Sequence, residues 1–259
     1  MNKLTVLGGS AAGVGTGAGC SGYLVQVNDT NVVLDLGPDT IQELRKHVDY
    51  RALDGIVVSH LHLDHVLDLF ALRFMLAYNP VKANRKIPLY LPPNGLAFFF
   101  KAAELFATAD DDIGQYFAAH FEMQEFDPAE SLVIRDISIT FAPTVHLIPC
   151  WAMRIHTPDG PDLVYTADTG TDADLNNFAA NAAVIVADSA AAASAPAFVK
   201  AGIHYDAAAA AQLASNAGAL HLVLTHQWEE LDPAANAAVA RETFLGRISI
   251  AAPGLTVTW

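Results

Sequence analysis

Short apolar stretches alternate with longer stretches of helical periodicity along the whole chain. The short stretches are rich in Val, Ile, Leu and Tyr and are bordered by Gly, Pro, Asn or Asp, which is the pattern of β-strands. Several are apolar throughout, and this indicates strands that are covered on both faces. Strands are predicted at Lys3–Leu7, Gly22–Val27, Val32–Asp35, Gly55–Ser59, Pro88–Leu91, Ile137–Ala142, Trp151–His156, Asp162–Thr166, Val184–Ala187, Leu220–Thr225 and Leu255–Thr258.

Apolar residues at three- and four-residue spacing predict helices between these strands. Helices are expected at Thr40–Val48, Val66–Ala77, Gly95–Thr108, Asp111–Phe121, Asp206–Ala217 and Pro233–Phe244. The alternation of strands and helices predicts an α/β fold. No linker-like stretch divides the sequence, so residues 1–259 are expected to form a single domain.

The composition is that of a globular, acidic protein, with 53% hydrophobic and 16% charged residues and a net charge of −14. This charge disfavours nucleic acid or an anionic membrane surface as a partner. The apolar segment Leu4–Leu7 is short and is followed by glycines, so we expect neither an export signal nor a membrane span. Two cysteines, Cys20 and Cys150, make no disulfide framework, which agrees with a reducing, cytoplasmic compartment.

Four potential metal ligands stand directly after the predicted strand Gly55–Ser59. The sequence HLHLDH places His60, His62, Asp64 and His65 within six positions. Such groups cost free energy to bury unless they are paired or bind a metal ion. His60 and His62 can face the same side of an extended segment, and Asp64 and His65 follow in the turn that opens the next helix. The group can therefore serve two neighbouring ions, and imidazole and carboxylate without thiolate suit zinc, with manganese or iron as alternatives.

Three further candidate ligands follow later apolar strands or turns. They are His146 in APTVHLIP, Asp168 in VYTADTG and His226 in LVLTHQW. A binuclear site needs ligands from outside the first cluster, and these three residues can supply them.

In this order the residues resemble the metallo-β-lactamase superfamily of binuclear metal-dependent hydrolases. The resemblance also includes LGGS at 7–10 and LDLG at 34–37. It implies a four-layer αββα sandwich with two divalent metal ions at one edge of the sheets. It implies that a hydroxide held between the ions attacks the substrate, and that Asp64 can orient this hydroxide. The implied ligands are His60, His62 and His146 for one ion and Asp64, His65 and His226 for the other, with Asp168 bridging both.

His204 lies just before the predicted helix Asp206–Ala217. In the phosphodiesterase branch of the family, which includes ribonuclease Z and small cyclic phosphodiesterases, a histidine at this place acts as general acid. The resemblance gives His204 that role, and Asp188 can orient its ring. A helix-entry histidine without a catalytic role is the other interpretation, because Tyr205 departs from the ribonuclease Z pattern.

The function indicated is hydrolysis of a small phosphodiester. The alternatives are a lactonase, thioesterase or β-lactamase-like activity on the same metal site, and a ribonuclease Z-type tRNA 3′ endonuclease, which the acidic charge and the absence of an RNA-binding arm disfavour. His62 argues against the redox diiron branch, which has glutamate there. A small-molecule substrate is expected, and the resemblance is compatible with a homodimer. The Phe-rich segment 95–126 either packs as core, which we favour, or shapes an apolar pocket over the metal site.

Overall fold

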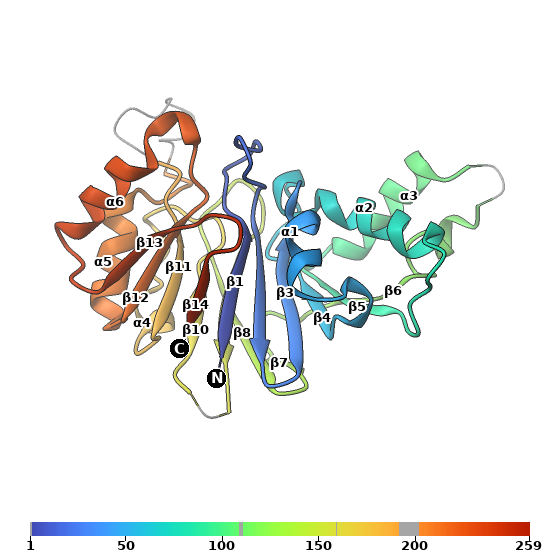
Figure 1. The fold of residues 1–259 in the computed structure, drawn as a ribbon, viewed down its shortest axis with the longest axis horizontal. Coiled ribbons are helices and arrows are strands. Elements are labelled where there is room, and N and C mark those ends of the chain that lie inside the picture. The colour runs from blue at the N-terminus through green and yellow to red at the C-terminus, as the bar shows by residue number, and fades with distance from the viewer. Residues whose placement is uncertain (1, 109–110, 159, 192–201) are drawn as a thin grey trace.

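Two β-sheets packed face to face form the centre of the structure, a computed structural model that describes residues 2–108, 111–158, 160–191 and 202–259 (Figure 1). The first sheet has the strand order β14-β1-β2-β3-β4-β5-β6. Strands β14, β1, β2 and β3 pair antiparallel, and β3 to β6 pair parallel. Their bounds are β1 Lys3–Gly8, β2 Gly22–Val27, β3 Thr30–Leu36, β4 Gly55–Val57, β5 Ile87–Leu91, β6 Phe121–Glu125 and β14 Thr256–Thr258.

The second sheet is mixed in the same way, with the order β13-β12-β11-β10-β9-β8-β7. Strands β7 to β10 pair antiparallel, and β10 to β13 pair parallel. Their bounds are β7 Leu132–Ile134, β8 Ile137–Pro143, β9 Trp151–His156, β10 Leu163–Tyr165, β11 Val184–Asp188, β12 His221–Thr225 and β13 Arg247–Ile250.

Helices cover the outer face of each sheet (Figure 1). Helices α1 to α3 pack on the first sheet and α4 to α6 on the second, while a third apolar cluster lies between the sheets. The predicted four-layer αββα sandwich is therefore confirmed. No helix in the described ranges is long and apolar enough to cross a bilayer. The helices are α1 Thr40–His47, α2 Leu63–Tyr78, α3 Gly95–Phe106, α4 Asn176–Ala179, α5 Ala207–Ala217 and α6 Pro233–Arg241, with 3₁₀ turns η1 Tyr50–Ala52, η2 Ile113–Gln115 and η3 Glu229–Leu231.

The helix predicted at Asp111–Phe121 is wrong. The described part of this segment forms the short turn η2 and further turns, and Phe121 already begins β6. Glycine at position 114 weakens a helix there, and Asp112 hydrogen-bonds the Gly114 amide in a local turn. The Phe-rich segment is core only in part, because Phe99, Phe117 and Phe121 are buried against α2 and the first sheet, whereas Phe100 and Phe106 are exposed.

Local signals fix the helix that follows the candidate general acid. The Asp206 carboxylate accepts a hydrogen bond from the Ala209 amide at 2.8 Å, so it caps the N-terminus of α5. Gly218 ends the helix in the left-handed conformation at φ 69°. These two ends hold the segment around residue 204 in place beside the second sheet.

The topology brings distant residues to one edge of the sandwich. The segments after β4, β8, β10, β11 and β12 all leave their strands at this edge, since β8 and the parallel strands of the second sheet point the same way. Such carboxyl ends of strands are the usual place for ligand sites in α/β folds. The candidate residues found in the sequence lie on these segments.

Candidate metal centre

The HLHLDH cluster lies where β4 ends and α2 begins. His60 and His62 stand in the loop after Val57, and His62 is the N-cap residue of α2. Asp64 and His65 form the first helical turn, so their side chains follow from the position at which the helix starts. His60 and His65 are completely buried, whereas His62 is half-buried.

The other three predicted ligands come from the second sheet. His146 lies on the connection between β8 and β9, Asp168 follows β10, and His226 follows β12. All three lie beside the HLHLDH cluster, and Asp168 belongs to each of three groups of side chains that could hold a metal ion. The first group is His60, His62, His146 and Asp168, and the second is Asp64, His65, Asp168 and His226, each with ligand atoms within 4.8 Å of one another. The third group, Asp168, Asp188, His204 and His226, meets the same criterion and includes the predicted general acid.

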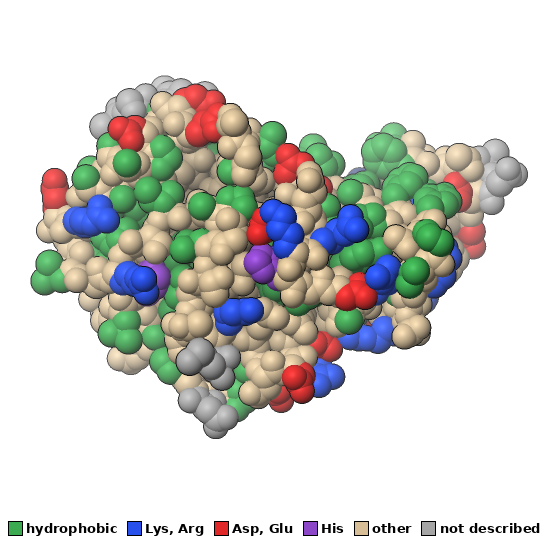
Figure 2. Space-filling model, viewed as in Figure 1, with side chains coloured by type: hydrophobic (Ala, Val, Ile, Leu, Met, Phe, Trp, Pro, Cys, Tyr) green, Lys and Arg blue, Asp and Glu red, His purple; other side chains and the backbone are tan. Residues whose placement is uncertain are grey.

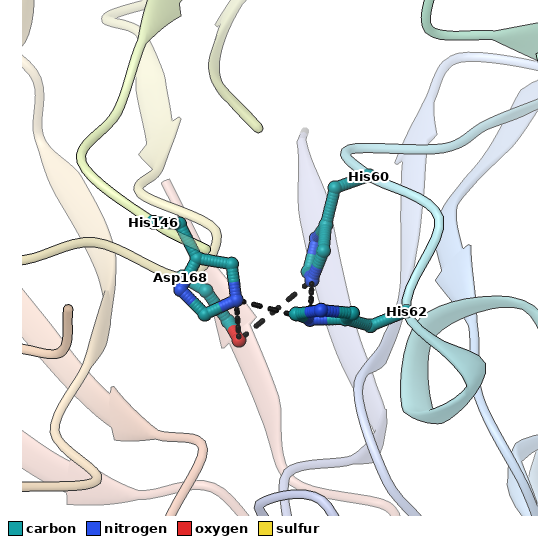
Figure 3. A group of neighbouring side chains, drawn as sticks. All are labelled: His60, His62, His146 and Asp168. Atoms are coloured by element: carbon teal, nitrogen blue, oxygen red, sulfur yellow. Dashed lines mark hydrogen bonds and ion pairs between the residues drawn. The ribbon is translucent and has the colours of Figure 1, made fainter. Parts of the chain in front are cut away.

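Three imidazole nitrogens converge in the first group (Figure 3). His62 Nδ1 lies 3.1 Å from His60 Nε2 and 3.0 Å from His146 Nε2. The Oδ2 atom of Asp168 lies 3.5 Å from His146 Nε2 and 3.8 Å from His60 Nε2. A neutral imidazole carries only one ring proton, so the three rings cannot satisfy one another as donors and acceptors. A cation between them can accept all three lone pairs, and the residues therefore fit a metal ion.

In the second group, ring nitrogens and carboxylate oxygens also converge on one point. His65 Nε2 lies 3.3 Å from Asp168 Oδ1 and 3.5 Å from Asp64 Oδ2. His226 Nε2 lies 3.1 Å from Asp64 Oδ2 and 3.5 Å from Asp168 Oδ2. His65 Nε2 is buried and has no hydrogen-bond partner, an arrangement that costs free energy unless a ligand occupies the space in front of it.

The opposite ring nitrogens of these histidines are held by the protein. His65 Nδ1 donates to Asp35 Oδ2 at 2.8 Å, and His146 Nδ1 lies 3.2 Å from the carbonyl of Ile203. His60 Nδ1 lies 3.0 Å from Ser59 Oγ. Such bonds assign the proton to Nδ1 and leave the Nε2 lone pair facing the centre, as metal-ligating histidines require.

Asp35 is the central supporting residue, and the sequence did not reveal its role. Its carboxylate accepts from the Ser59 amide and hydroxyl, both at 2.7 Å, from His65 and from the Tyr165 hydroxyl at 2.8 Å. Through Ser59 it also orients His60, so one buried carboxylate supports both groups. Asp35 has φ 55°, a left-handed conformation that costs free energy for a residue with a side chain. The LDLG motif contains it, but only the fold shows its four donors.

Charges within the cluster shift pKa values in opposite directions. Burial and the His65 charge lower the pKa of His60 well below its usual value, and burial lowers the pKa of His146. Burial alone would also lower the pKa values of His65 and His226, but the charges of Asp168 and other carboxylates have a larger, opposite effect. They raise the pKa of His65 well above its usual value and that of His226 to about 10. Burial alone would raise the pKa of Asp168, yet His226 and His65 hold it well below its usual value. The site therefore keeps an ionised carboxylate at its centre.

His204 and Asp188 lie directly beside this centre. The His204 ring is 5.1 Å from the ring of His146 and 5.2 Å from that of His226, on which it stacks. His204 Nδ1 lies 2.8 Å from Asp188 Oδ2, which also accepts from the Thr169 amide. Burial alone would raise the pKa of Asp188, but the adjacent His204 lowers it, so the carboxylate is ionised. The structure thus brings His204 to the predicted ligands, with Asp188 as its partner.

The two cysteines are free and buried, as the absence of a disulfide framework predicts. Burial, with the charge of Asp64, raises the pKa of Cys20 to about 12. Burial also raises the pKa of Cys150, whose thiol donates to the Asp168 carbonyl at 3.4 Å. Both groups stay protonated near neutral pH, and a protonated thiol is a poor metal ligand.

Changing Asp35 to Asn should weaken metal binding about 10- to 100-fold while leaving all the predicted ligands in place. An amide has only one acceptor oxygen, so it cannot accept from Ser59, His65 and Tyr165 together. The measurement is a zinc titration against a competing chelator. The matched control is Asp54→Asn, because Asp54 is also largely buried and accepts from Asn31 and Arg85 away from the centre. Equal zinc affinity in wild type and Asp35→Asn would contradict the role of Asp35.

Comparison with known proteins adds two findings. The sequence pattern described as the β-lactamase superfamily domain matches residues 30–227. The probable metallo-hydrolase YhfI of Bacillus subtilis is 29% identical over 230 residues, which cover 86% of either chain. The crystal structure of YhfI, described as a metallo-β-lactamase fold protein, superposes with a TM-score of 0.85 at 28% identity and covers 99% of this chain and 98% of that one.

More distant structures share the fold alone. A diphosphatase from the PhnP family superposes with a TM-score of 0.74 at 20% identity, covering 100% of this chain and 98% of that one. The short form of human tRNase Z superposes with a TM-score of 0.74 at 18% identity, covering 99% and 98%. These structural similarities support the fold of the chain. The substrate has to be inferred from the residues of this chain.

Proposed function

Because the chain belongs to the β-lactamase superfamily and carries the His/Asp cluster of a metal-dependent hydrolase, we propose that it hydrolyses small phosphodiesters with two divalent metal ions. The proposal goes beyond the family in two respects, the number of ions and the reaction. Both rest on where individual side chains lie around the cluster.

The proposed ligands divide into two sets that share one carboxylate. His60, His62 and His146 hold one ion, Asp64, His65 and His226 hold the other, and Asp168 contacts both sets. The nitrogen and oxygen donors suit zinc. When bound, such ions polarise the phosphorus–oxygen bond and make a water molecule a good nucleophile near neutral pH. Asp64 is the most exposed carboxylate of the cluster, so it can accept a hydrogen bond from that water molecule.

The position of His204 is the observation that carries the choice of phosphodiesters. Its ring lies against His146 of one set and His226 of the other, yet its side chain is 12% exposed, more than those two rings. It therefore faces a substrate that enters the centre. Hydrolysis of a phosphodiester expels an alkoxide, which needs a proton, and a histidine supplies it effectively near neutral pH.

Asp188 prepares His204 for this step. The hydrogen bond from His204 Nδ1 to Asp188 leaves Nε2 free to carry the proton that moves to the leaving oxygen. The other oxygen of Asp188 lies 3.6 Å from His226 Nδ1, so the residue that orients the proposed proton donor also lies beside a proposed metal ligand.

The acidic charge of the chain favours a small substrate over a polynucleotide. Binding of RNA or DNA rests on phosphate neutralisation by Lys and Arg. The chain carries 28 acidic and 14 basic side chains. A substrate with a single phosphodiester needs only the positive charge of the metal centre.

Metal-loaded protein should cleave bis(4-nitrophenyl) phosphate at least about 100-fold faster than it opens a lactone or a β-lactam of matched reactivity, because the anionic phosphate binds the two proposed metal ions, whereas the reacting carbonyl of a lactone or β-lactam is neutral. The assay follows nitrophenolate release with zinc and, separately, with manganese. Protein stripped by a chelator is the control, and it should be inactive. Turnover of the lactone or lactam without turnover of the phosphodiester would overturn the proposal and move the substrate class to carboxylic acid derivatives.

A further inference from the structure

Helix α2 has an inverted distribution of polar and apolar residues. Its ionisable side chains Asp64, His65, Asp68 and Arg73 are all buried. Its exposed positions are apolar or aromatic, namely Leu63, Leu67, Ala71, Phe74 and Tyr78. A surface helix normally exposes its polar face, so this arrangement leaves an apolar stripe open to solvent that begins at the metal centre. Figure 2 shows hydrophobic side chains gathered over the lobe that α2 and α3 form in Figure 1.

The segment that carries His146 shows the same property on the other side of the centre. Its exposed positions are Pro143, Val145, Leu147 and Pro149. Leu147 is 69% exposed, although a leucine usually gains free energy by burial. Two segments that supply proposed ligands, one from each sheet, therefore carry apolar or aromatic residues at their exposed positions.

The two segments meet at the cluster, where His62 Nδ1 and His146 Nε2 lie 3.0 Å apart. The seven predicted ligands are mostly closed off, but the Asp64 side chain is 11% exposed and His62 is half-buried. Leu63 stands between these two residues and is 57% exposed. Leu63, Leu67, Val145 and Leu147 together form what we call the apolar rim.

The charges around the cluster are also informative. Within the described residues, the ion pairs of the cluster join only histidines and aspartates, and no Lys or Arg takes part in them. Among these described partners the proposed metal ions are therefore the positive charge available to an anionic group of the substrate. Beyond that group the surroundings favour apolar contact.

From these observations we propose that the apolar rim binds an alkyl or aryl substituent of the substrate, so that the substrate class is a phosphodiester with one charged group and an apolar ester arm. This inference rests on the proposed function for the reacting group, but the rim itself is a property of Leu63, Leu67, Val145 and Leu147. A substrate of this class places its phosphate in the cluster and its arm over α2 or the segment around residue 146. The rim is continuous with the cluster, which favours a substrate arm over a separate partner.

Binding of alkylphosphonates tests the rim without turnover. Methyl-, butyl- and octylphosphonate are titrated into the metal-loaded protein by calorimetry. A fully buried methylene raises affinity about fourfold, so a partly buried chain should raise affinity at least about tenfold from methyl- to octylphosphonate. Leu63→Ser and Leu147→Ser should each lower the octyl-to-methyl affinity ratio several-fold. The matched controls are Leu220→Ser and Leu245→Ser, exposed leucines outside the rim, which should keep the wild-type ratio.

Equal affinities for the three phosphonates in the wild type would overturn the inference. The inference would also be wrong if the rim variants keep the wild-type affinity ratio. A change of oligomeric state in the rim variants, measured by light scattering, together with no effect of chain length on affinity, would mean that the rim contacts a second copy of the chain instead. The two proposals fail separately. Phosphodiester turnover without a chain-length effect contradicts the rim alone, whereas a chain-length effect without phosphodiester turnover contradicts the proposed reaction alone.

Discussion

Replacing Asp168 with alanine should remove bound metal and turnover together. Asp168 is the one residue that belongs to both sets of proposed ligands, and its two oxygens lie between 3.3 and 3.8 Å from ring nitrogens of His65, His146, His226 and His60. Without it, each set loses a carboxylate and the positive charges of the centre face one another uncompensated. We expect metal affinity to fall more than about 100-fold, beyond the loss typical of residues that only orient ligands.

Metal content by mass spectrometry and phosphodiester turnover are measured on the same purified sample, with circular dichroism as a check on folding. His62→Ala should behave similarly, but with loss of one ion first, because His62 contacts only the first set. The matched control is Asp162→Asn, a carboxylate that pairs with Arg154 far from the centre. An active Asp168→Ala protein with a full metal complement would refute the assignment of the centre.

The second large effect is expected for His204→Ala, which should retain both metal ions and lose turnover about 10²- to 10⁴-fold, the usual contribution of a general acid. His204 lies against the proposed ligands and belongs to neither proposed set, although it forms a third possible ligand group with Asp168, Asp188 and His226. Its removal takes away the proton for the leaving oxygen. The loss should therefore be smaller for 4-nitrophenol, which leaves readily as an anion, than for an alcohol leaving group.

Asp188→Asn provides the positioning control, since its amide keeps the size of the side chain but not its charge. We expect a smaller loss of turnover than in His204→Ala, because an amide oxygen is a weaker acceptor for the His204 ring than a carboxylate. Metal content distinguishes the roles. If His204→Ala loses metal to the same degree as turnover, then His204 is a ligand and not a proton donor.

The candidate residues that the structure brings together were found by two kinds of signal. HLHLDH lies at a strand end followed by a helix, and such a junction places the side chains by local geometry alone. His146, Asp168 and His226 follow later strands or turns, and they were joined to the cluster by the order of residues that resembles the metallo-β-lactamase superfamily. Their assembly in the structure agrees with the predicted grouping, whereas the metal-ligating roles stay predictions.

The residues that the sequence did not identify depend on contacts between distant segments. Asp35 is one acidic residue among many in the sequence, and only the packing of β3 against β4 and β10 brings Ser59, His65 and Tyr165 to its carboxylate. The apolar rim was missed for a similar reason. Leucines on α2 look like core in the sequence, and only the exposed fraction of each side chain separates Leu63 from Val66.

The pairing of β14 with β1 means that residues 256–258 close the first sheet beside residues 3–5. During synthesis the N-terminal segments emerge first, yet β1 lacks its outer neighbour until nearly all of the chain described here has left the ribosome. His226 likewise emerges more than 150 residues after His65. A nascent chain therefore exposes HLHLDH as an incomplete, open chelating motif for most of its translation. The proposed ligand sets are therefore complete only after the segments that carry Asp168 and His226 have been synthesised.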